Sequence, residues 1–298
     1  MKLSEATELL LMDAAARRLS PMTIRFYRQR CQSVIKVIGD SRAEHITAND
    51  VRSALASTTA ASARLNFAFL RRLFRFLHDE EVTSRNPLER VTAPKTLQKV
   101  IYPLTIEEIR RCYKYARVNR GFFGLRNSVI FATLLGTGMR RQELCSLREQ
   151  DVRISEGLLL VHGKGGRQRL LPIPSSLKQL LARYRFARNE TRVASRQCDR
   201  FFRDRGGGPL TPANVTRVLE RLGKVAGVHL HPHRLRHTFA TAYMSNDGAD
   251  VLSLQSICGW STIAMATRYT KPSLDKLKRS MESFSPANQL SGFQPRDL

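Results

Sequence analysis

A proline-containing segment without apolar periodicity, residues 91–103, divides the sequence and constrains its fold more than any other feature. Pro94 and Pro103 in such a stretch are typical of a linker, because proline does not continue a helix or a central strand. Beyond it, Thr105 and Glu108 form the T-x-x-E pattern of a capping box, which predicts a new helix. The 298 residues suffice for two domains. We therefore predict a helical domain over residues 1–92, a linker over 93–104 and a second domain over 105–298.

Helical periodicity dominates the first predicted domain. Ser20 before Pro21 is an N-cap followed by a first-turn proline, and it predicts a helix that ends at Ile38. Residues 47–56 are a second candidate helix. Residues 60–78 have the clearest pattern, with an apolar face made of Leu65, Phe69, Leu73, Phe76 and Leu77. The opposite face carries Arg64, Arg71 and Arg75, which either form a solvated surface or contact DNA.

The second predicted domain combines helices with one short hairpin. Residues 125–135 are largely apolar and predict a buried helix, which the glycines of 136–138 interrupt. Residues 158–162 and 168–173 predict two strands joined by a glycine-rich tip that contains Lys164. Further helices are expected over 176–187, 211–223, 233–245, 251–257, 262–269 and 273–284. The predicted fold is mainly α with a small β-hairpin or sheet (α+β) in the second domain, and all-α in the first.

The charge of the chain predicts a polyanionic partner. Lysine and arginine number 50 against 25 acidic residues, a net charge of +25. Residues 1–92 hold 15 basic and 10 acidic residues, whereas the remainder holds 35 and 15, so the second domain carries most of the attraction. No apolar run reaches membrane-spanning length, and residues 1–16 are typical of an amphipathic helix rather than a signal peptide. Together with five scattered cysteines, these features predict a cytoplasmic, nucleoid-associated protein without a membrane partner.

Two arginines stand at positions suited to binding a phosphate. Arg140 follows a Gly-Thr-Gly break at a predicted helix start, and Glu143, three residues later, can hold its guanidinium group. His233 and Arg236 are also three apart, so they share one face of a predicted helix. Two guanidinium groups that converge on one phosphate would stabilise the extra negative charge of a pentacoordinate transition state.

Lys164 and Tyr269 complete a candidate catalytic set. A lysine at a hairpin tip can donate a proton to a leaving oxygen, and a phenol activated by nearby cations can act as a nucleophile. Each feature alone has an ordinary alternative: a surface ion pair, a solvated lysine or a packed tyrosine. The histidines His229, His231, His233 and His237 suggest zinc, but they lack the glutamate of an H-E-x-x-H motif and a cysteine pair. We expect no metal site.

The order of these residues resembles that of the tyrosine site-specific recombinases, the family of phage integrases and Xer proteins. Residues 137–144 resemble the first arginine box of that family, and residues 163–174 its lysine hairpin. Residues 231–241 are similar to the H-x-x-R box, and residues 254–270 to the last box, which ends with the nucleophile. The resemblance covers about residues 105 to 275, while residues 1–92 are similar to the helical core-binding domain on weaker patterns.

The resemblance implies a role for each residue. Arg140 and Arg236 would grip the scissile phosphate, and Lys164 would protonate the 5′-oxygen. His233 would assist proton transfer to or from Tyr269, which would form a 3′-phosphotyrosyl link. Such enzymes need neither metal nor ATP, so no cofactor is expected, in keeping with the missing P-loop.

Trp260 stands where many members of the family have histidine. Its indole N–H can still donate a hydrogen bond to the phosphate, or the ring can simply pack beneath Tyr269. The implied partners are a specific duplex DNA site and further copies of the chain in a tetramer, with accessory DNA-bending proteins left open. Residues 273–284 carry an apolar stripe that packs either on its own domain or on a neighbouring protomer. Two alternatives remain: a DNA-binding regulator without catalysis, and a monomeric enzyme like type IB topoisomerases.

Overall fold

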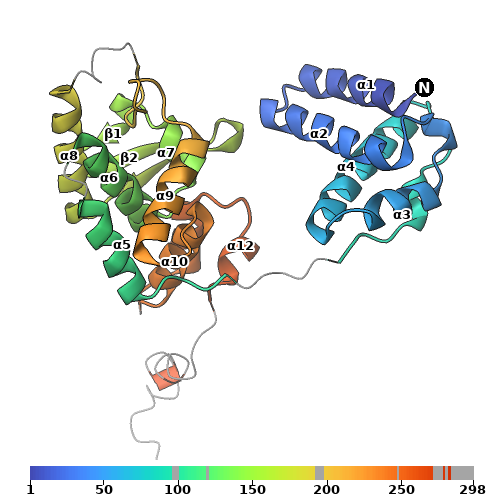
Figure 1. Cartoon of the computed structure of the whole chain (residues 1–298). Helices are drawn as coiled ribbons and strands as arrows, with labels where there is room; N and C mark the ends of the chain where they lie inside the picture. Colours follow the sequence, from blue (N-terminus) through green and yellow to red (C-terminus); the bar gives the residue numbers. More distant parts are fainter. Residues whose placement is uncertain are drawn as a thin grey trace, which may run out of the picture. The chain divides into compact units, whose positions relative to one another are not determined.

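The computed structural model describes residues 1–95, 101–118, 121–191, 198–246, 248–270, 278, 281 and 282. The chain divides into two compact units, Met1–Lys99 and Val100–Leu298. It is mostly helical with one small antiparallel sheet (Figure 1), which confirms the predicted fold class. The predicted helix over residues 273–284, with its apolar stripe, lies almost wholly outside the described residues. No described helix is both long and apolar enough to cross a membrane.

The first unit is a small helical domain. Its elements are α1 (Leu3–Ala16), α2 (Pro21–Ile38), the 3-10 turn Ala43–His45, α3 (Ala48–Ala56), α4 (Ala60–Asp79) and the 3-10 turn Pro87–Arg90. Helices α1 and α2 pack side by side (Figure 1), and both contact α4. The Ser20 hydroxyl accepts a hydrogen bond from the Thr23 amide, which caps α2 as the sequence predicts.

Helix α4 supplies most of the core of this unit. Leu70, Leu73 and Leu77 are fully buried, so the predicted amphipathic helix is confirmed. Leu65, however, is 44% exposed, and its assignment to the apolar face was wrong. The buried face is centred on the row of Leu70, Leu73 and Leu77, and Leu65 lies at its edge, where polar Asn66 is buried instead.

The second unit surrounds a short sheet with helices. Its helices are α5 (Ile106–Val118), α6 (Phe122–Thr137), α7 (Arg141–Ser146), α8 (Ser175–Asn189), α9 (Pro212–Ala226), α10 (Pro232–Met244), α11 (Val251–Cys258) and α12 (Ala264–Thr267). The strands are β1 (Val152–Arg153), β2 (Leu158–His162) and β3 (Gln168–Pro172), in the order β1-β2-β3. Strand β1, two residues long, was not predicted, whereas the β2–β3 hairpin is confirmed, with Leu160 opposite Leu170.

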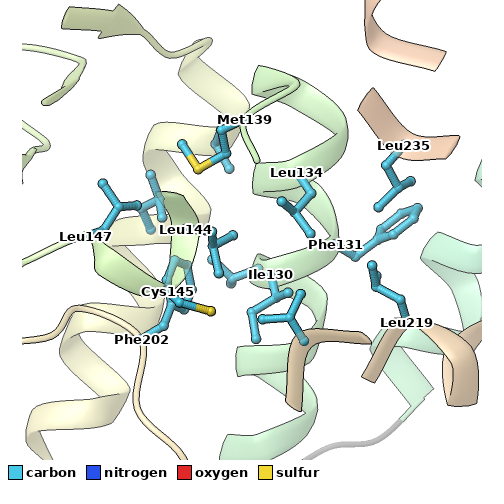
Figure 2. Close-up of a cluster of buried hydrophobic side chains, with 14 of the residues drawn as sticks. Ile130, Phe131, Leu134, Met139, Leu144, Cys145, Leu147, Phe202, Leu219 and Leu235 are labelled. Atoms are coloured by element: carbon cyan, nitrogen blue, oxygen red, sulfur yellow. The ribbon is translucent and has the colours of Figure 1, made fainter. Parts of the chain in front are cut away.

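Helix α6 is the centre of the second unit and fixes the position of the helices beside it. Ile130, Phe131 and Leu134 are buried, as the apolar run of the sequence predicts. In Figure 2, Leu144 of α7 lies on one side of this row and Leu235 of α10 on the other. Burial of each such side chain contributes about 1.5–3 kcal/mol. The shared core therefore places the starts of α7 and α10 close to the C-terminal end of α6.

Glycines end helices α6 and α11. Gly138 follows α6 and Gly259 follows α11, each with a φ of 62° in the left-handed region. A Cβ at Gly138 would collide with the Phe239 ring, and one at Gly259 would lie 2.7 Å from Arg169 Nη1. Both turns therefore need glycine for conformation and for close approach.

Candidate active site

The first site arginine, Arg140, stands directly before α7 as its N-cap residue. Its Nη1 donates to Glu143 Oε1 at 2.9 Å, and its amide donates to Glu143 Oε2 at 2.7 Å. The ion pair predicted from the spacing is therefore present. Arg140 also donates to the carbonyl oxygens of Cys258 at 3.4 Å and Gly259 at 3.1 Å. Its side chain remains 40% exposed, so it is anchored and still accessible to a ligand.

Glu143 holds two arginines at once. The carboxylate is 5% exposed and also accepts two hydrogen bonds from Arg169 of β3, at 3.0 and 2.8 Å. Burial alone raises the pKa of Glu143, but the bonds from Arg169 and Arg140 outweigh it and leave that pKa below its usual range. Glu143 is therefore ionised, and its charge compensates the two cations beside it.

Arg169 was not identified from the sequence. Its Nε donates to the carbonyl oxygen of Ile257 at 2.9 Å, while its other nitrogens bind Glu143. It lies in the strand that follows the hairpin tip, so it links β3 to the end of α11. Nothing local marks it, because arginine is abundant in this chain. The one available signal was Gly259, whose lack of a side chain admits the guanidinium group.

Arg236 lies one turn into α10 and is 8% exposed. Its nitrogens donate to the carbonyl oxygens of Gly138 and Cys258, both at 2.8 Å. Its guanidinium carbon lies 5.0 Å from the centre of the Trp260 ring, a cation–π contact. Burial lowers the pKa of Arg236, but an arginine starts so high that it keeps its charge.

The arginines converge at the C-terminal end of α11. Ile257, Cys258 and Gly259 provide the carbonyl oxygens that a helix end leaves without internal partners. Arg140 and Arg236 share the Cys258 oxygen, so their guanidinium groups are neighbours. The negative end of the helix dipole favours this concentration of positive charge. Two adjacent guanidinium groups with planar, rigid N–H donors can bind a phosphate.

Trp260 and Tyr269 extend the site beyond the arginines. Their rings stack at a centroid distance of 5.5 Å and an angle of 8°. Trp260 is 8% exposed, with Arg236 on its ring and Tyr269 packed against it. The packing expected for Trp260 is thus present. Burial raises the pKa of Tyr269, and the charges of Arg268 and Arg236 oppose that rise.

The hydroxyl of Tyr269 contacts a histidine that sequence analysis did not select. His237 Nδ1 lies 3.2 Å from the Tyr269 oxygen, within hydrogen-bond distance. His233, selected from the sequence, lies one turn earlier on α10 with part of its ring in solvent. Partial burial together with Arg141, Arg236 and Arg140 lowers its pKa. The four-residue spacing of His233 and His237 puts both on one face of a helix, so it was the signal that could have identified His237.

Lys164 lies in the 3-10 turn Lys164–Gly166, between β2 and β3. The Gly163 amide donates to the Arg167 carbonyl at 2.7 Å and closes this tip. The side chain of Lys164 lies outside the part of the chain that the structure describes. Its predicted role therefore stays a prediction.

The remaining histidines have a structural explanation. His231 is the N-cap of α10, and its Nδ1 accepts a hydrogen bond from the Arg234 amide at 3.2 Å. Its ring lies against His229, with the ring centres 5.2 Å apart. Among the described residues, no three histidine, cysteine or acidic side chains form a group that could hold a metal ion.

Known proteins share both units of this chain. Residues 103–275 match the model of the phage integrase family, and residues 11–81 match that of the phage integrase N-terminal SAM-like domain. The chain belongs to the phage integrase family. It is 35% identical over 257 residues to the tyrosine recombinase XerC of Bacillus licheniformis, covering 82% of each chain. It is 32% identical over 278 residues to XerA of Thermococcus kodakarensis, covering 92% of this chain and 93% of that one.

Solved structures of family members have the same fold. A lambda integrase (75–356) dimer bound to a COC′ core site has a TM-score of 0.72 at 22% identity, over 89% of this chain and 97% of that one. XerA recombinase has a TM-score of 0.52 at 23% identity, over 95% and 99%. The prediction of a tyrosine recombinase, an enzyme of site-specific recombination, is thereby confirmed.

Proposed function

We propose that this recombinase cleaves and rejoins duplex DNA at a specific site, with Tyr269 as the nucleophile. The observation that carries the proposal is the shared contact of Arg140 and Arg236 with Cys258, beside the stacked rings of Trp260 and Tyr269. Trp260 contacts both Arg236 and Tyr269, so a phosphate bound by the two guanidinium groups would lie near the phenol. That arrangement matches the needs of an attack on phosphorus.

The proposed reaction is two transesterifications. The Tyr269 oxygen bonds to phosphorus, the bond to the 5′-oxygen breaks, and a 3′-phosphotyrosyl link results. Arg140 and Arg236 bind the phosphate oxygens and stabilise the charge of the transition state, and the proton of the phenol passes to a histidine of α10. Lys164, brought in by the hairpin tip, gives its proton to the departing 5′-oxygen. Rejoining reverses these steps with a new 5′-hydroxyl, so no external energy source is consumed.

The proposed partners are duplex DNA and further copies of the chain. The net charge of +25 supports a polyanionic ligand. One related structure is a lambda integrase tetramer bound to a Holliday junction, with a TM-score of 0.71 and 21% identity. We infer the same kind of tetramer here, with residues 1–92 as a core-binding domain. In that domain the exposed arginines of α4, Arg64, Arg71 and Arg75, would contact the DNA backbone.

The test is capture of the covalent adduct on a nicked suicide substrate. Wild type should accumulate a protein–DNA adduct, whereas Tyr269→Phe should form none and still bind DNA, because it loses one oxygen only. Tyr243→Phe is the matched control, since Tyr243 packs in the same apolar cluster, and it should retain the adduct. An adduct formed by Tyr269→Phe would refute the assignment. Absence of adduct in wild type would favour a regulator without catalysis.

A further inference from the structure

The partner of the Tyr269 hydroxyl is the feature that the proposed reaction leaves unexplained. His237 Nδ1 lies 3.2 Å from the phenol oxygen, and the two ring centres are 5.2 Å apart with an angle of 48° between the planes. His237 lies on α10 directly after Arg236, whose guanidinium carbon lies 5.0 Å from the centre of the Trp260 ring. One helix therefore carries both a proposed phosphate ligand and the group in contact with the nucleophile.

We propose that His237 is the base that takes the proton of Tyr269 during cleavage and returns it during rejoining. This inference rests on the proposed function, because it assigns a role within the same reaction. It moves to His237 the proton transfer that the sequence pattern assigns to His233. The contact with the reacting oxygen makes His237 a catalytic residue rather than a support for one.

The contact with the phenol bears on the tautomer of His237. Burial and Arg268 lower the pKa of His237, and the backbone of Ile101 opposes that lowering. With Nδ1 facing the phenol, Nε2 is the nitrogen available to carry the proton of the neutral ring. In the neutral ring, Nδ1 then presents its lone pair to the Tyr269 O–H group.

The segment before α5 is fixed to α10 on both sides of His237. Arg234 Nε donates to the Tyr102 carbonyl at 3.0 Å, and the Leu104 amide donates to Thr238 Oγ1 at 2.8 Å. Arg234 is further bound by the carboxylate of Glu108 on α5, at 3.0 Å. These bonds fix the segment on both sides of His237 along α10 and so hold the helix backbone that carries the imidazole.

The charges around the pair favour a neutral histidine and a protonated phenol. Partial burial and Arg268, at the end of α12, lower the pKa of His237. Burial raises the pKa of Tyr269, against the opposing effects of Arg268 and Arg236, and the nearby Cys258 thiol adds to the rise. At neutral pH the phenol therefore keeps its proton, and an unprotonated base stands next to it. Direct ionisation of the phenol would be rare under these conditions.

The proton balance of cleavage follows from these contacts. The Tyr269 proton passes to His237 Nδ1 as the oxygen bonds to phosphorus, and Lys164 supplies a different proton to the 5′-oxygen. During rejoining, the same proton returns to the departing phenol oxygen. His233, one turn earlier on α10 and three residues before Arg236, is left for the phosphate.

The test is the pH dependence of adduct formation in a single turnover on the suicide substrate, for full-length protein saturated with DNA. In wild type the rate should rise with pH to a plateau as His237 loses its proton. His237→Gln keeps an acceptor near the phenol but cannot take a proton. It should lower the plateau by about 10²- to 10⁴-fold and remove this inflection. In His237→Ala, added imidazole should restore the rate at least about tenfold.

Controls separate this role from a structural one. His229→Gln, at an exposed histidine outside the site, should leave the rate and its pH profile unchanged. DNA affinity and the fluorescence of Trp260 should be unaltered in the His237 variants. A plateau rate of His237→Gln within about threefold of wild type would overturn the proposal. So would slow His237 variants whose rate keeps the pH inflection and does not increase with added imidazole. Wild type without any adduct would instead overturn the proposed function itself.

Discussion

Replacement of Glu143 by glutamine tests whether one buried carboxylate holds the arginine cluster together. Four donors reach its two oxygens: the Arg140 amide, Arg140 Nη1 and two nitrogens of Arg169, at 2.7 to 3.0 Å. A glutamine amide offers a single oxygen, so at least two of these bonds are lost. In addition, Arg169 and Arg140 lose the negative charge that compensates them.

The expected cost of Glu143→Gln is about 3 kcal/mol in the free energy of unfolding. Two bonds to a charged group contribute roughly 1.5–3 kcal/mol each, and relief from burying a carboxylate offsets part of the loss. The share of Arg140 is discounted because its side chain is 40% exposed, whereas Arg169 is 13% exposed. Because Arg140 also loses its anchor, adduct formation should fall by about ten- to a hundredfold.

The chain provides its own probe for this measurement. Trp260 is the single tryptophan and lies in the second unit, so its fluorescence in urea follows the unfolding of that unit alone. Glu156→Gln is a matched control, because Glu156 pairs with Arg153 at the same three-residue spacing but on the surface. It should change stability by less than about 0.5 kcal/mol.

The pH dependence of the same comparison checks the cause. Because the folded pKa of Glu143 is lowered, its stabilisation is present above the unfolded value of about 4.3 and is lost as pH falls through the folded value. The difference in unfolding free energy between wild type and Glu143→Gln should therefore become smaller at acidic pH. If the unfolding free energy of Glu143→Gln lies within about 0.5 kcal/mol of the wild-type value at pH 7, the carboxylate does not hold the arginine cluster together.

Two further predictions concern the helix that carries the site and the surface of the first unit. Below neutral pH, protonation of the His231 ring should remove the cap of α10 and destabilise the second unit by about 1 kcal/mol. Burial, together with His229, His233 and Arg234, lowers the pKa of His231 in the folded state. The stabilisation by this cap is therefore present above the unfolded pKa and is lost as pH falls. His231→Asn, which caps without titrating, should lose less unfolding free energy than wild type between pH 7 and 5, as measured by Trp260 fluorescence in urea. An equal loss would contradict the capping role of His231. Replacement of Arg64, Arg71 and Arg75 together by alanine should reduce the log–log slope of DNA affinity against salt by about 2.7 if each contacts one phosphate. An unchanged slope would show that this stripe is merely solvated.

The parts of the fold that could be predicted are those with strong local patterns. Helix α4 and the burial of Phe69, Leu73, Phe76 and Leu77 follow from apolar spacing, and α6 from a largely apolar run. Strand β1 could not be found, because two residues carry no periodicity. The Arg140–Glu143 pair was predictable because its partners lie on one short helix start.

The missed parts of the site depend on contacts between distant segments. Arg169 and Glu143 are separated by 26 residues, and His237 and Tyr269 by 32. Local spacing can mark a residue on a helix face, but it does not show which distant residue that side chain meets, since tertiary packing alone brings such pairs together. Within the set Arg169, His237 and Gly259, the glycine was the sole residue whose type hinted at a close approach.

The arginine cluster is assembled by peptide carbonyls, and this has a consequence for phosphate binding. Arg140 and Arg236 donate to the oxygens of Gly138, Cys258 and Gly259, which carry partial charges only. A phosphate oxygen with a full charge is a stronger acceptor, so it can draw some of these N–H groups away without separating the guanidinium groups. Glu143, held by Arg169 as well, keeps Arg140 in place during this exchange. In the proposed reaction the cations would thus be oriented before DNA arrives, and little reorganisation would be left for the transition state.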